Sequence, residues 1–412
     1  MTPEQDILNR LLDKYENSKH LLEPGVSHRR VMLSIRKKEL PLYQYEDASI
    51  RDAYHAAASA LESRGLISLE WLDNHLLLSA VILNLDQVMA CYPAAGRIHP
   101  RQRAANVAAL ISEHLQDVSV PWIRAWADDT CTRAREKLQV PAFYKEEPQL
   151  LMDLLTAFQA YASMPEAMTM RAFSSKCYHD TKYFERHVRE PFLRIARRYD
   201  PELSFACEES ELGVRDQLSV LGIYARPELY ELAGNCTLIT KDGAIPIGAA
   251  PRSGLAIPST LVSDLLSMEL PDITCITFIE NKTNYDEYLL SERQMEELVV
   301  YHGGFLSPQK RKLFRLLARS APDTAVVRFW ADIDLGGFQM FQHLQDLIPQ
   351  LQPMRMDASS VEKYHETGLA RPDAYLERLR SALAEDAYPL FRDAITAILR
   401  YQVTIEQEAF LN

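Results

Sequence analysis

The spacing of apolar residues predicts two kinds of element in the first hundred residues. Apolar positions three and four apart predict helices over residues 3–20 and 50–63. Two strand-like runs, 66–72 and 76–83, predict a β-hairpin with its turn at Asp73-Asn74-His75. Helices followed by a small hairpin are typical of a winged-helix module, although a small α+β packing domain fits the same pattern equally well.

A longer helical stretch follows this module. Amphipathic spacing, interrupted by Pro-containing connections, predicts helices over residues 99–118, 120–138 and 147–163. Three successive amphipathic helices are typical of an arm or spacer bundle. A second compact region begins after the arm, and it includes a predicted helix over 180–199 followed by mixed elements to about residue 270.

The apolar pattern changes in the last third of the chain. Continuous β-branched and apolar runs at 273–279, 298–301 and 325–330 alternate with a predicted helix over about 307–320. Such runs are typical of strands that are buried on both faces of a parallel sheet and joined by helical crossovers. We therefore predict a multi-domain α/β protein with a parallel sheet near its C-terminus.

Composition agrees with a helix-rich or mixed α/β protein. At roughly 100–200 residues per domain, the 412 residues predict two to four domains, and 14 glycines are too few for a turn-dense all-β fold. No apolar run reaches the ~18 residues of a membrane span, and the charged N-terminus lacks the apolar core of a signal peptide. We therefore expect a cytoplasmic protein without membrane contact. The cysteines have no zinc-site spacing and are expected to be reduced thiols: Cys91, Cys131, Cys177, Cys207, Cys236 and Cys275.

The charge distribution is uneven. A net charge of −12 argues against a protein that coats nucleic acid without specificity. The average hides a basic segment, because residues 171–198 hold eight Lys and Arg against three Asp and Glu. An ordinary solvated helix face has the same pattern, so the signal for DNA binding is weak by itself. The candidate DNA contacts in this segment are Arg171, Lys176, Lys182 and Arg186.

Acidic side chains follow two of the predicted buried strands. Glu280 ends the first run, and Asp332 and Asp334 end the third. Functional groups collect beyond the carboxyl ends of parallel strands, and Asp-x-Asp spacing places both carboxylates on the same side of an extended segment. Three converging carboxylates would repel one another without a cation, and Mg²⁺ suits such oxygen ligands best. Helix capping or plain solvation after a strand is the alternative for each acid.

At these acids the sequence resembles a Toprim domain, the metal-dependent catalytic fold shared by topoisomerases, primases and certain nucleases. More specifically, it is similar to the JetD family, the nuclease subunits of Wadjet anti-plasmid defence systems, which are related to the A subunit of topoisomerase VI. The resemblance covers roughly residues 165–412, whereas the first 160 residues match only in general build. The matching motifs are 170–174 (MRAFS), 179–184 (HDTKYF), 279–283 (IENKT), 301–305 (YHGGF), 330–338 (WADIDLGGF) and 405–408 (IEQE).

The resemblance implies a role for each matched position. Glu280, Asp332 and Asp334 would bind one or two Mg²⁺ ions, for which Mn²⁺ could substitute. Glu280 would also be a candidate acid or base, and Glu408 a further catalytic carboxylate. Lys282 would either contact DNA phosphate or pair with a neighbouring acid. Ala331 stands where the family usually has Gly, a change that leaves both aspartates in place.

The resemblance also implies an architecture and a function. We expect a Mg²⁺-dependent endonuclease that hydrolyses double-stranded plasmid DNA as a homodimer, together with an SMC-type ATPase, a kleisin and a small KITE-like winged-helix subunit. Two alternatives stay open. One is a topoisomerase VI-like transesterase with Tyr178 or Tyr183 as nucleophile, although the family is thought to have lost this tyrosine. The other is a non-catalytic DNA-binding adaptor whose acids bind a structural ion. The expected domains are a winged-helix-like module (1–95), a helical arm (96–164), a CAP-like winged-helix domain (165–270) and a Toprim domain with a Rossmann-like parallel sheet (271–412).

Overall fold

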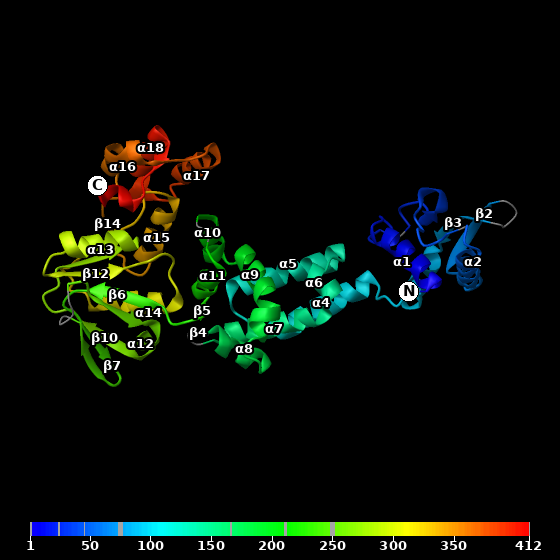
Figure 1. The fold of residues 1–412 in the computed structure, drawn as a ribbon, viewed down its shortest axis with the longest axis horizontal. Coiled ribbons are helices and arrows are strands. Elements are labelled where there is room, and N and C mark those ends of the chain that lie inside the picture. The colour runs from blue at the N-terminus through cyan, green and yellow to red at the C-terminus, as the bar shows by residue number, and fades with distance from the viewer. Residues whose placement is uncertain are drawn as a thin grey trace. The chain divides into compact units, whose positions relative to one another are not determined.

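The chain forms two compact units, residues 1–159 and 160–412 (Figure 1). The computed structural model describes residues 2–411 apart from residues 24, 45, 73–76, 165–166, 210–211 and 248–251. Helices and several separate sheets occur together, which confirms the prediction of a multi-domain α/β chain. The finer division into four domains stays a prediction. Within the described ranges, no helix combines the length and the apolar character that crossing a bilayer requires.

The first unit begins with a small α/β module. Strands β2 and β3 pair antiparallel, as predicted, and β1 adds a third strand on the other side of β3. The turn predicted at residues 73–75 lies outside the described residues. Leu11, Leu61 and Val81 belong to one buried cluster, so helices and sheet share a single core. The elements are α1 (Pro3–Glu16), β1 (Met32–Ser34), η1 (Ile35–Lys37), α2 (Ala48–Ser63), β2 (Ile67–Leu72), β3 (Leu77–Leu83), η2 (Leu85–Gln87) and α3 (Val88–Ala94).

Helices complete the first unit. They are α4 (Pro100–Leu115), α5 (Pro121–Lys137), α6 (Ala142–Glu146) and α7 (Pro148–Ala162). The three long helices match those predicted for the arm. Proline at the first position starts α4 and α5, because the amide that proline lacks would be unpaired there anyway. Phe158 packs edge-on against Trp122 and Trp126 at 5.5 and 5.0 Å between ring centroids, which joins α7 to α5.

The second unit begins with a helical part. Its elements are β4 (Met168–Thr169), α8 (Met170–Tyr178), a π-helical turn (Phe184–Val188), α9 (Arg189–Tyr199), α10 (Pro201–Glu209), α11 (Val214–Val220) and β5 (Ile223–Tyr224). The sequence predicts one helix over 180–199, whereas the structure has the π-helical turn before α9. The Asp180 carboxylate accepts a hydrogen bond from Lys182 N (2.7 Å), which keeps the chain in a turn before the helical segment begins.

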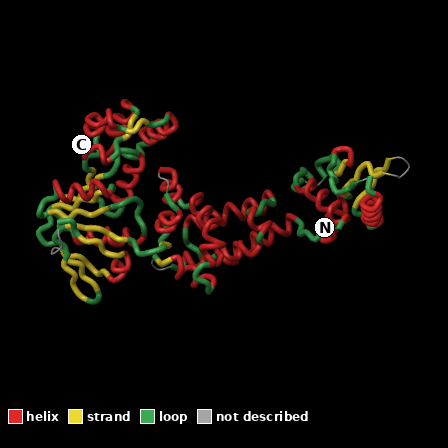
Figure 2. Tube along the Cα trace, in the orientation of Figure 1, coloured by secondary structure: helices red, strands yellow, loops and turns green. Residues whose placement is uncertain are grey.

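A six-stranded mixed sheet forms the rest of the core of this unit (Figure 2). Its spatial order is β14 (Gln352–Pro353), β13 (Val326–Trp330), β11 (Cys275–Ile279), β12 (Glu297–Tyr301), β6 (Leu229–Ala233) and β9 (Leu255–Pro258). The first four are parallel. Of these, β11, β12 and β13 were predicted and β14 was not, and β6 and β9 add antiparallel strands at one edge. Ile279 is in register with Tyr301 on one side and Trp330 on the other. The three central strands therefore end together.

Helices and two smaller sheets, one of three strands (β10, β7, β8) and one of two (β15, β16), accompany these strands. Phe278 and Phe314 pack edge-on at 4.9 Å between centroids, so β11 and α14 share the core. The C-terminal tail returns to the sheet, because Ile333 and Ile405 form an isolated antiparallel bridge. The elements are β7 (Thr237–Thr240), β8 (Gly243–Pro246), α12 (Ser259–Asp264), β10 (Leu265–Glu269), α13 (Lys282–Ser291), α14 (Pro308–Ser320), α15 (Leu335–Gln345), α16 (Ala358–Tyr364), η4 (His365–Thr367), β15 (Leu369–Ala370), α17 (Asp373–Ala384), η5 (Pro389–Phe391), α18 (Arg392–Tyr401), β16 (Val403–Thr404) and η6 (Gln407–Leu411).

Candidate active site

Two of the predicted acids lie side by side at the carboxyl edge of the sheet. Glu280 directly follows β11, and its backbone N–H donates to Trp330 O (3.0 Å) at the end of β13. Asp332 is two residues beyond Trp330 on that neighbouring strand. The parallel register thus brings together two carboxylates that are more than fifty residues apart in the chain.

Asp334 performs the capping role that the sequence left open. Its Oδ1 accepts the Gly337 N–H (2.9 Å) at the start of α15, and its Oδ2 lies 3.4 Å from Arg371 Nη2. A Cβ at Gly337 would stand 2.0 Å from Asp332 O, so only glycine lets the helix begin this close to the strand end. Both oxygens of Asp334 are engaged, which makes it the least suited of the three acids to a further ligand.

The C-terminal tail supplies Glu408 and a buried glutamine. Gln407 is fully buried; its backbone N–H donates to Asp332 Oδ1 (2.7 Å), and its side chain accepts from Asn281 N (2.8 Å) and donates to Trp330 O (3.2 Å). Asn281 Nδ2 in turn donates to Glu408 Oε1 (2.7 Å). Glu408 therefore reaches the site, but it lies in the short 3₁₀ helix η6 rather than in the longer helical pattern that begins at residue 404 of the sequence.

Burial and mutual repulsion act on the acids together. Burial, with Asp334 as the next cause, raises the pKa of Glu280 to about 7. Burial, followed by the charge of Glu280, raises the pKa of Asp332 to about 8. The charge of Glu408 raises both of these pKa values further. The edge of the sheet thus holds several carboxylates that a nearby cation would stabilise in their charged form.

The donor set fits a hydrated magnesium ion better than a closed protein cage. In the part of the chain that the structure describes, no three Asp, Glu, His or Cys side chains could hold a metal ion among them. Mg²⁺ commonly keeps several waters and is bound by one or two carboxylates together with substrate phosphates. Glu280 and Asp332 supply hard oxygen donors of that kind at neighbouring strand ends. These two residues, with Glu408 nearby, are the fitting ligands for such an ion.

A glycine turn beside Glu280 is held by a lysine that the sequence analysis did not single out. Lys310 is 8% exposed, and its Nζ donates to Gly303 O (2.5 Å) and Phe305 O (3.2 Å). The Gly304 N–H lowers the pKa of the Glu280 carboxylate. Gly303 and Gly304 both have positive φ, +54° and +58°, so the pair serves backbone geometry. Lys310 and Gln407 were missed because nothing in their local pattern distinguishes them from surface residues.

Two comparisons with known proteins concern this site. Residues 235–411 match the family model for the C-terminal part of Wadjet protein JetD. The chain is also 25% identical over 412 residues to the Wadjet protein JetD of Bacillus cereus (strain Q1), which covers 98% of each chain. The chain is similar to JetD throughout. The resemblance read from the motifs is confirmed, and it extends into the first 160 residues, where the motifs did not reach. The JetD-matched region contains Glu280, Asp332, Asp334 and Glu408.

Lys282, in the JetD-matched region, forms ion pairs rather than standing open for phosphate. Its Nζ lies 2.7 Å from Glu231 Oε2 and 2.8 Å from Asp286 Oδ1. The ammonium also lies over the Tyr301 ring, 5.5 Å from the centroid. The alternative of pairing with an acid thus holds, although the partners are Glu231 and Asp286 and not Glu280. A phosphate contact by Lys282 stays a prediction.

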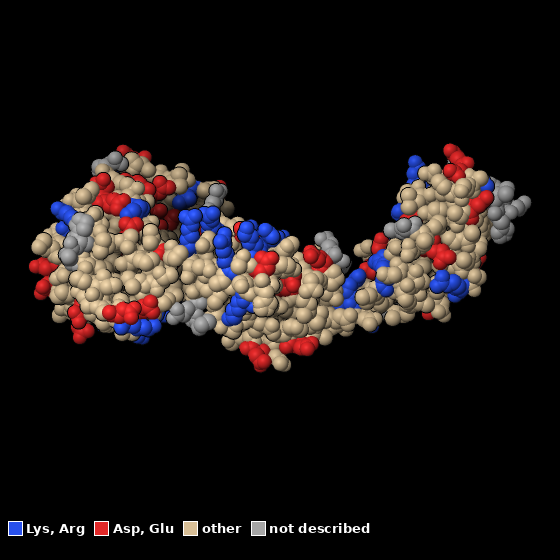
Figure 3. All heavy atoms as spheres, turned by 60° about the horizontal axis from the view of Figure 1, so that its bottom comes forward, with Lys and Arg blue, Asp and Glu red and all other residues tan. Residues whose placement is uncertain are grey.

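The other candidate DNA contacts lie before the JetD-matched region. Their side chains are exposed on α8 and the turns after it: Arg171, Lys176, Lys182 and Arg186. Arg171 also lines a pocket of about 490 Å³ with Arg189, Arg215 and Arg226. Figure 3 shows Lys and Arg side chains gathered over this helical part. The structure thus adds Arg215 and Arg226 to the basic segment, and DNA contact by its members stays a prediction.

The two candidate tyrosine nucleophiles pack against each other. Tyr178 and Tyr183 have ring centroids 4.7 Å apart, and Tyr183 lies 4.7 Å from the His187 ring. Both rings therefore serve in packing, and a role of either tyrosine as nucleophile stays a prediction.

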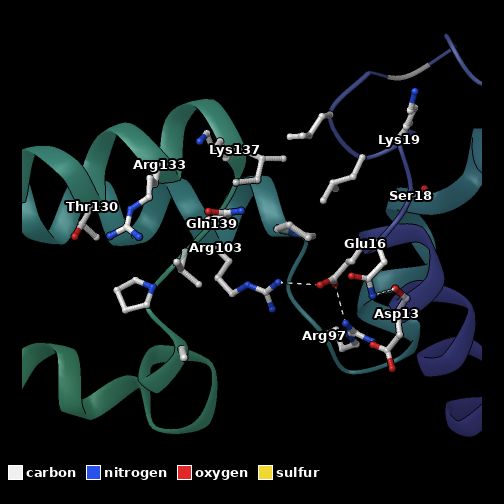
Figure 4. A pocket seen from close by; sticks show the side chains of 18 of the residues that line it. Asp13, Glu16, Ser18, Lys19, Arg97, Arg103, Thr130, Arg133, Lys137 and Gln139 are labelled. Atoms are coloured by element: carbon white, nitrogen blue, oxygen red, sulfur yellow. Dashed lines mark hydrogen bonds and ion pairs between the residues drawn. The ribbon is translucent and has the colours of Figure 1, made fainter. Parts of the chain in front are cut away.

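A larger pocket, of about 1120 Å³, lies in the first unit (Figure 4). Glu16 accepts from Arg97 Nη2 (2.7 Å) and Arg103 Nη2 (3.2 Å), and Asp13 pairs with Arg97 Nη1 (2.7 Å). These ion pairs join the end of α1 to the start of α4. None of the sequence motifs lines this pocket, and four of its charged side chains pair with one another: Asp13, Glu16, Arg97 and Arg103. We therefore read it as a structural connection.

Proposed function

We propose that the chain is the DNA-cleaving subunit of a Wadjet-type anti-plasmid system, a Mg²⁺-dependent endonuclease that hydrolyses double-stranded DNA. The observation that carries this proposal is the meeting of Glu280, Asp332 and Glu408 at one edge of the sheet, inside the region that matches JetD. The raised pKa values of Glu280 and Asp332 add to it, because perturbed carboxylates collect at catalytic sites.

The residues divide the work of hydrolysis. A bound Mg²⁺ would polarise the scissile phosphate and lower the pKa of a water nucleophile. Glu280, whose pKa is about 7, can accept a proton from water or return one to the leaving oxygen at neutral pH. Gln407 N–H holds Asp332 Oδ1, and Asn281 Nδ2 holds Glu408, so both carboxylates are oriented before substrate arrives.

The finer architecture is part of the proposal. The first module resembles a winged helix, since α1 and α2 accompany a three-stranded sheet that ends in the β2–β3 hairpin. The parallel strands with Glu280 after β11 and Asp332 after β13 support a Toprim domain. The exposed basic side chains of α8 and the following turn support a CAP-like, DNA-contacting domain before it.

The partners follow from the same reasoning. One site of this kind cuts one strand, so a homodimer would supply the two sites that a double-strand break needs. A chain with net charge −12 binds DNA weakly by itself, which suits a subunit that others bring to DNA. We propose that an SMC-type ATPase, a kleisin and a KITE-like subunit do so.

The test replaces Asp332 by Asn, with Glu406→Gln as a matched control in an exposed acid of the tail motif. We expect Asp332→Asn to abolish plasmid clearance by the complete system in cells and Mg²⁺-dependent plasmid cleavage in vitro, and Glu406→Gln to leave both unchanged. Clearance that survives Asp332→Asn would indicate the non-catalytic adaptor instead.

The chemistry of the cut ends separates hydrolysis from transesterification. We expect protein-free ends after denaturation, because water is the proposed nucleophile. DNA ends covalently bound to the chain, and lost in Tyr178→Phe or Tyr183→Phe, would indicate the topoisomerase-like alternative.

A further inference from the structure

A buried lysine stands behind the carboxylate site. Lys310, in the first turn of α14, is 8% exposed, and its ammonium donates to the carbonyls of Gly303 (2.5 Å) and Phe305 (3.2 Å). Glu228 faces it from the other side, where that carboxylate accepts from Tyr230 OH (2.6 Å) and Ser307 Oγ (2.5 Å). The lysine is thus surrounded by acceptors and has little contact with water.

Burying this charge has a cost that stability alone does not explain. Burial lowers the pKa of Lys310, which shows that the site disfavours the charged form. A methionine of similar length would fill the same space without desolvating an ammonium. The two carbonyl acceptors belong to one short turn. Unlike methionine, the lysine can therefore hold the conformation of that turn through two hydrogen bonds.

The turn contacts Glu280. The turn follows His302, whose backbone N–H donates to Ile279 O (2.7 Å), the residue directly before Glu280. Gly304 lies between the two carbonyls that Lys310 binds, and its N–H lowers the pKa of the Glu280 carboxylate. Gly303 and Gly304 both adopt the left-handed conformation, and a Cβ on Gly303 would come within 2.8 Å of the Tyr301 ring. Lys310 therefore holds the carbonyl side of the turn, opposite to the Gly304 N–H that is directed at Glu280.

We propose that Lys310 is a positioning residue, whose ammonium fixes the 303–305 turn so that the Gly304 amide holds the Glu280 carboxylate in its working orientation. This inference rests on the proposed nuclease function, because the working orientation is the one in which Glu280 would take part in hydrolysis. Outer-shell hydrogen bonds of this kind are what orient a carboxylate toward metal and substrate.

The test compares Lys310→Met with Lys312→Met in the full chain. Lys312 is a matched control, because it lies on the same helix but donates to Ser263 O (3.1 Å), which is outside the turn. Amide hydrogen exchange of a peptide covering residues 301–306 is measured without metal, and affinity for Mn²⁺ is measured with the metal alone. We expect Lys310→Met to exchange faster at Gly304 and Phe305 and to bind Mn²⁺ about tenfold more weakly.

Several outcomes would overturn the positioning role. Exchange of the turn and Mn²⁺ affinity equal to those of Lys312→Met would do so. For Lys310→Met, we expect kcat for plasmid cleavage to fall while the Kd for DNA stays unchanged. A weaker Kd with an unchanged kcat would also overturn the positioning role. If Lys310→Met does not fold, Lys310→Gln, which keeps an N–H donor group in its side-chain amide, is compared with Lys312→Gln in the same assays.

The two proposals can fail separately. If the unaltered chain cuts no DNA and binds no Mn²⁺, the nuclease function fails, yet the exchange comparison still decides whether Lys310 holds the turn. If the unaltered chain cuts DNA and Glu280→Gln does not, while Lys310→Met matches its control in every assay, only the positioning role fails.

Discussion

The two ends of the central strands hold acids in opposite circumstances. Near the amino ends, Glu297 is 1% exposed, but Arg328 Nη2 lies 3.1 Å from its Oε1, and Tyr288 OH (2.9 Å), Thr277 Oγ1 and Gln294 N donate to the carboxylate. At the carboxyl ends, Glu280 and Asp332 face other acids. Both regions use the same strands, so the sheet does not decide what an acid does.

The difference shows how to tell a structural acid from a functional one. A carboxylate with a cation and several donors is satisfied inside the protein and has no remaining need for a ligand. Carboxylates that repel one another lower the stability of the fold unless a cation binds, and such an arrangement is retained where a ligand completes it. The predictions below test this contrast, in order of decreasing effect.

The largest effect is expected from Glu280→Gln. Loss of a carboxylate that acts as acid or base should lower the cleavage rate by about 10²–10⁴-fold. The midpoint of thermal unfolding without metal should stay the same or rise, because a buried, repelled charge is removed. Plasmid cleavage and calorimetry check the two parts, and a lower midpoint would contradict the assignment of Glu280 as an uncompensated acid.

Glu297→Gln should show the reverse behaviour. The amide cannot neutralise Arg328, so partly buried donors are left without their acceptor, and we expect a loss of about 1–3 kcal/mol in the free energy of unfolding. Urea denaturation measures this loss. The cleavage rate of the folded variant should match that of the unaltered chain. If Glu297→Gln cleaved slowly and kept its full unfolding free energy, the contrast between the two strand ends would be contradicted.

The pH dependence of stability should also separate the two ends. The fold raises the pKa of Glu280 to about 7 and the pKa of Asp332 to about 8. At pH values between the ordinary and the raised pKa of each acid, the folded chain therefore binds more protons than the unfolded chain. The contribution of these acids to stability is therefore complete at low pH and is lost progressively as pH rises from their ordinary pKa values of 4.5 and 3.8 to about 7 and about 8. Without metal, the unfolding midpoint of the unaltered chain should fall over this range more than that of Glu280→Gln/Asp332→Asn.

Mg²⁺ provides the control for this pH effect. Added Mg²⁺ should raise the midpoint of the unaltered chain at pH 8 and leave the double variant unchanged, because an ion stabilises only carboxylates that are present. Equal pH slopes for the two chains would contradict the raised pKa values.

The smallest effect is expected from Lys282→Gln. Its ammonium lies in partly exposed ion pairs with Glu231 and Asp286, and pairs of this kind contribute about 0–1 kcal/mol. We expect unfolding free energy and DNA affinity to stay nearly unchanged. DNA affinity is measured at several salt concentrations. If the slope of log affinity against log salt concentration became smaller by about one in Lys282→Gln, Lys282 would instead be a phosphate contact.

The strands that carry the acids could be predicted because their signals are local. Runs of mostly β-branched and apolar residues at 273–279 and 325–330 predicted buried parallel strands, and the acids after them predicted a site at the strand ends. The antiparallel edge formed by β6 and β9 had no such signal, because their short half-exposed segments do not differ from loops. The turn before α9 was missed for a related reason, since helical spacing continues through it.

By itself, the sequence determined the three central parallel strands, their ends and the identity of the acids, because periodicity and burial preference act over a few residues. The tertiary structure alone decided which groups surround those acids. Asn281 and Gln407 are hydrogen-bonded across 126 positions of sequence, and Lys310 meets Glu280 only through the turn at Gly304. Such contacts depend on how distant segments pack, and that packing determines which acid is neutralised, like Glu297, and which is left in need of a cation, like Glu280.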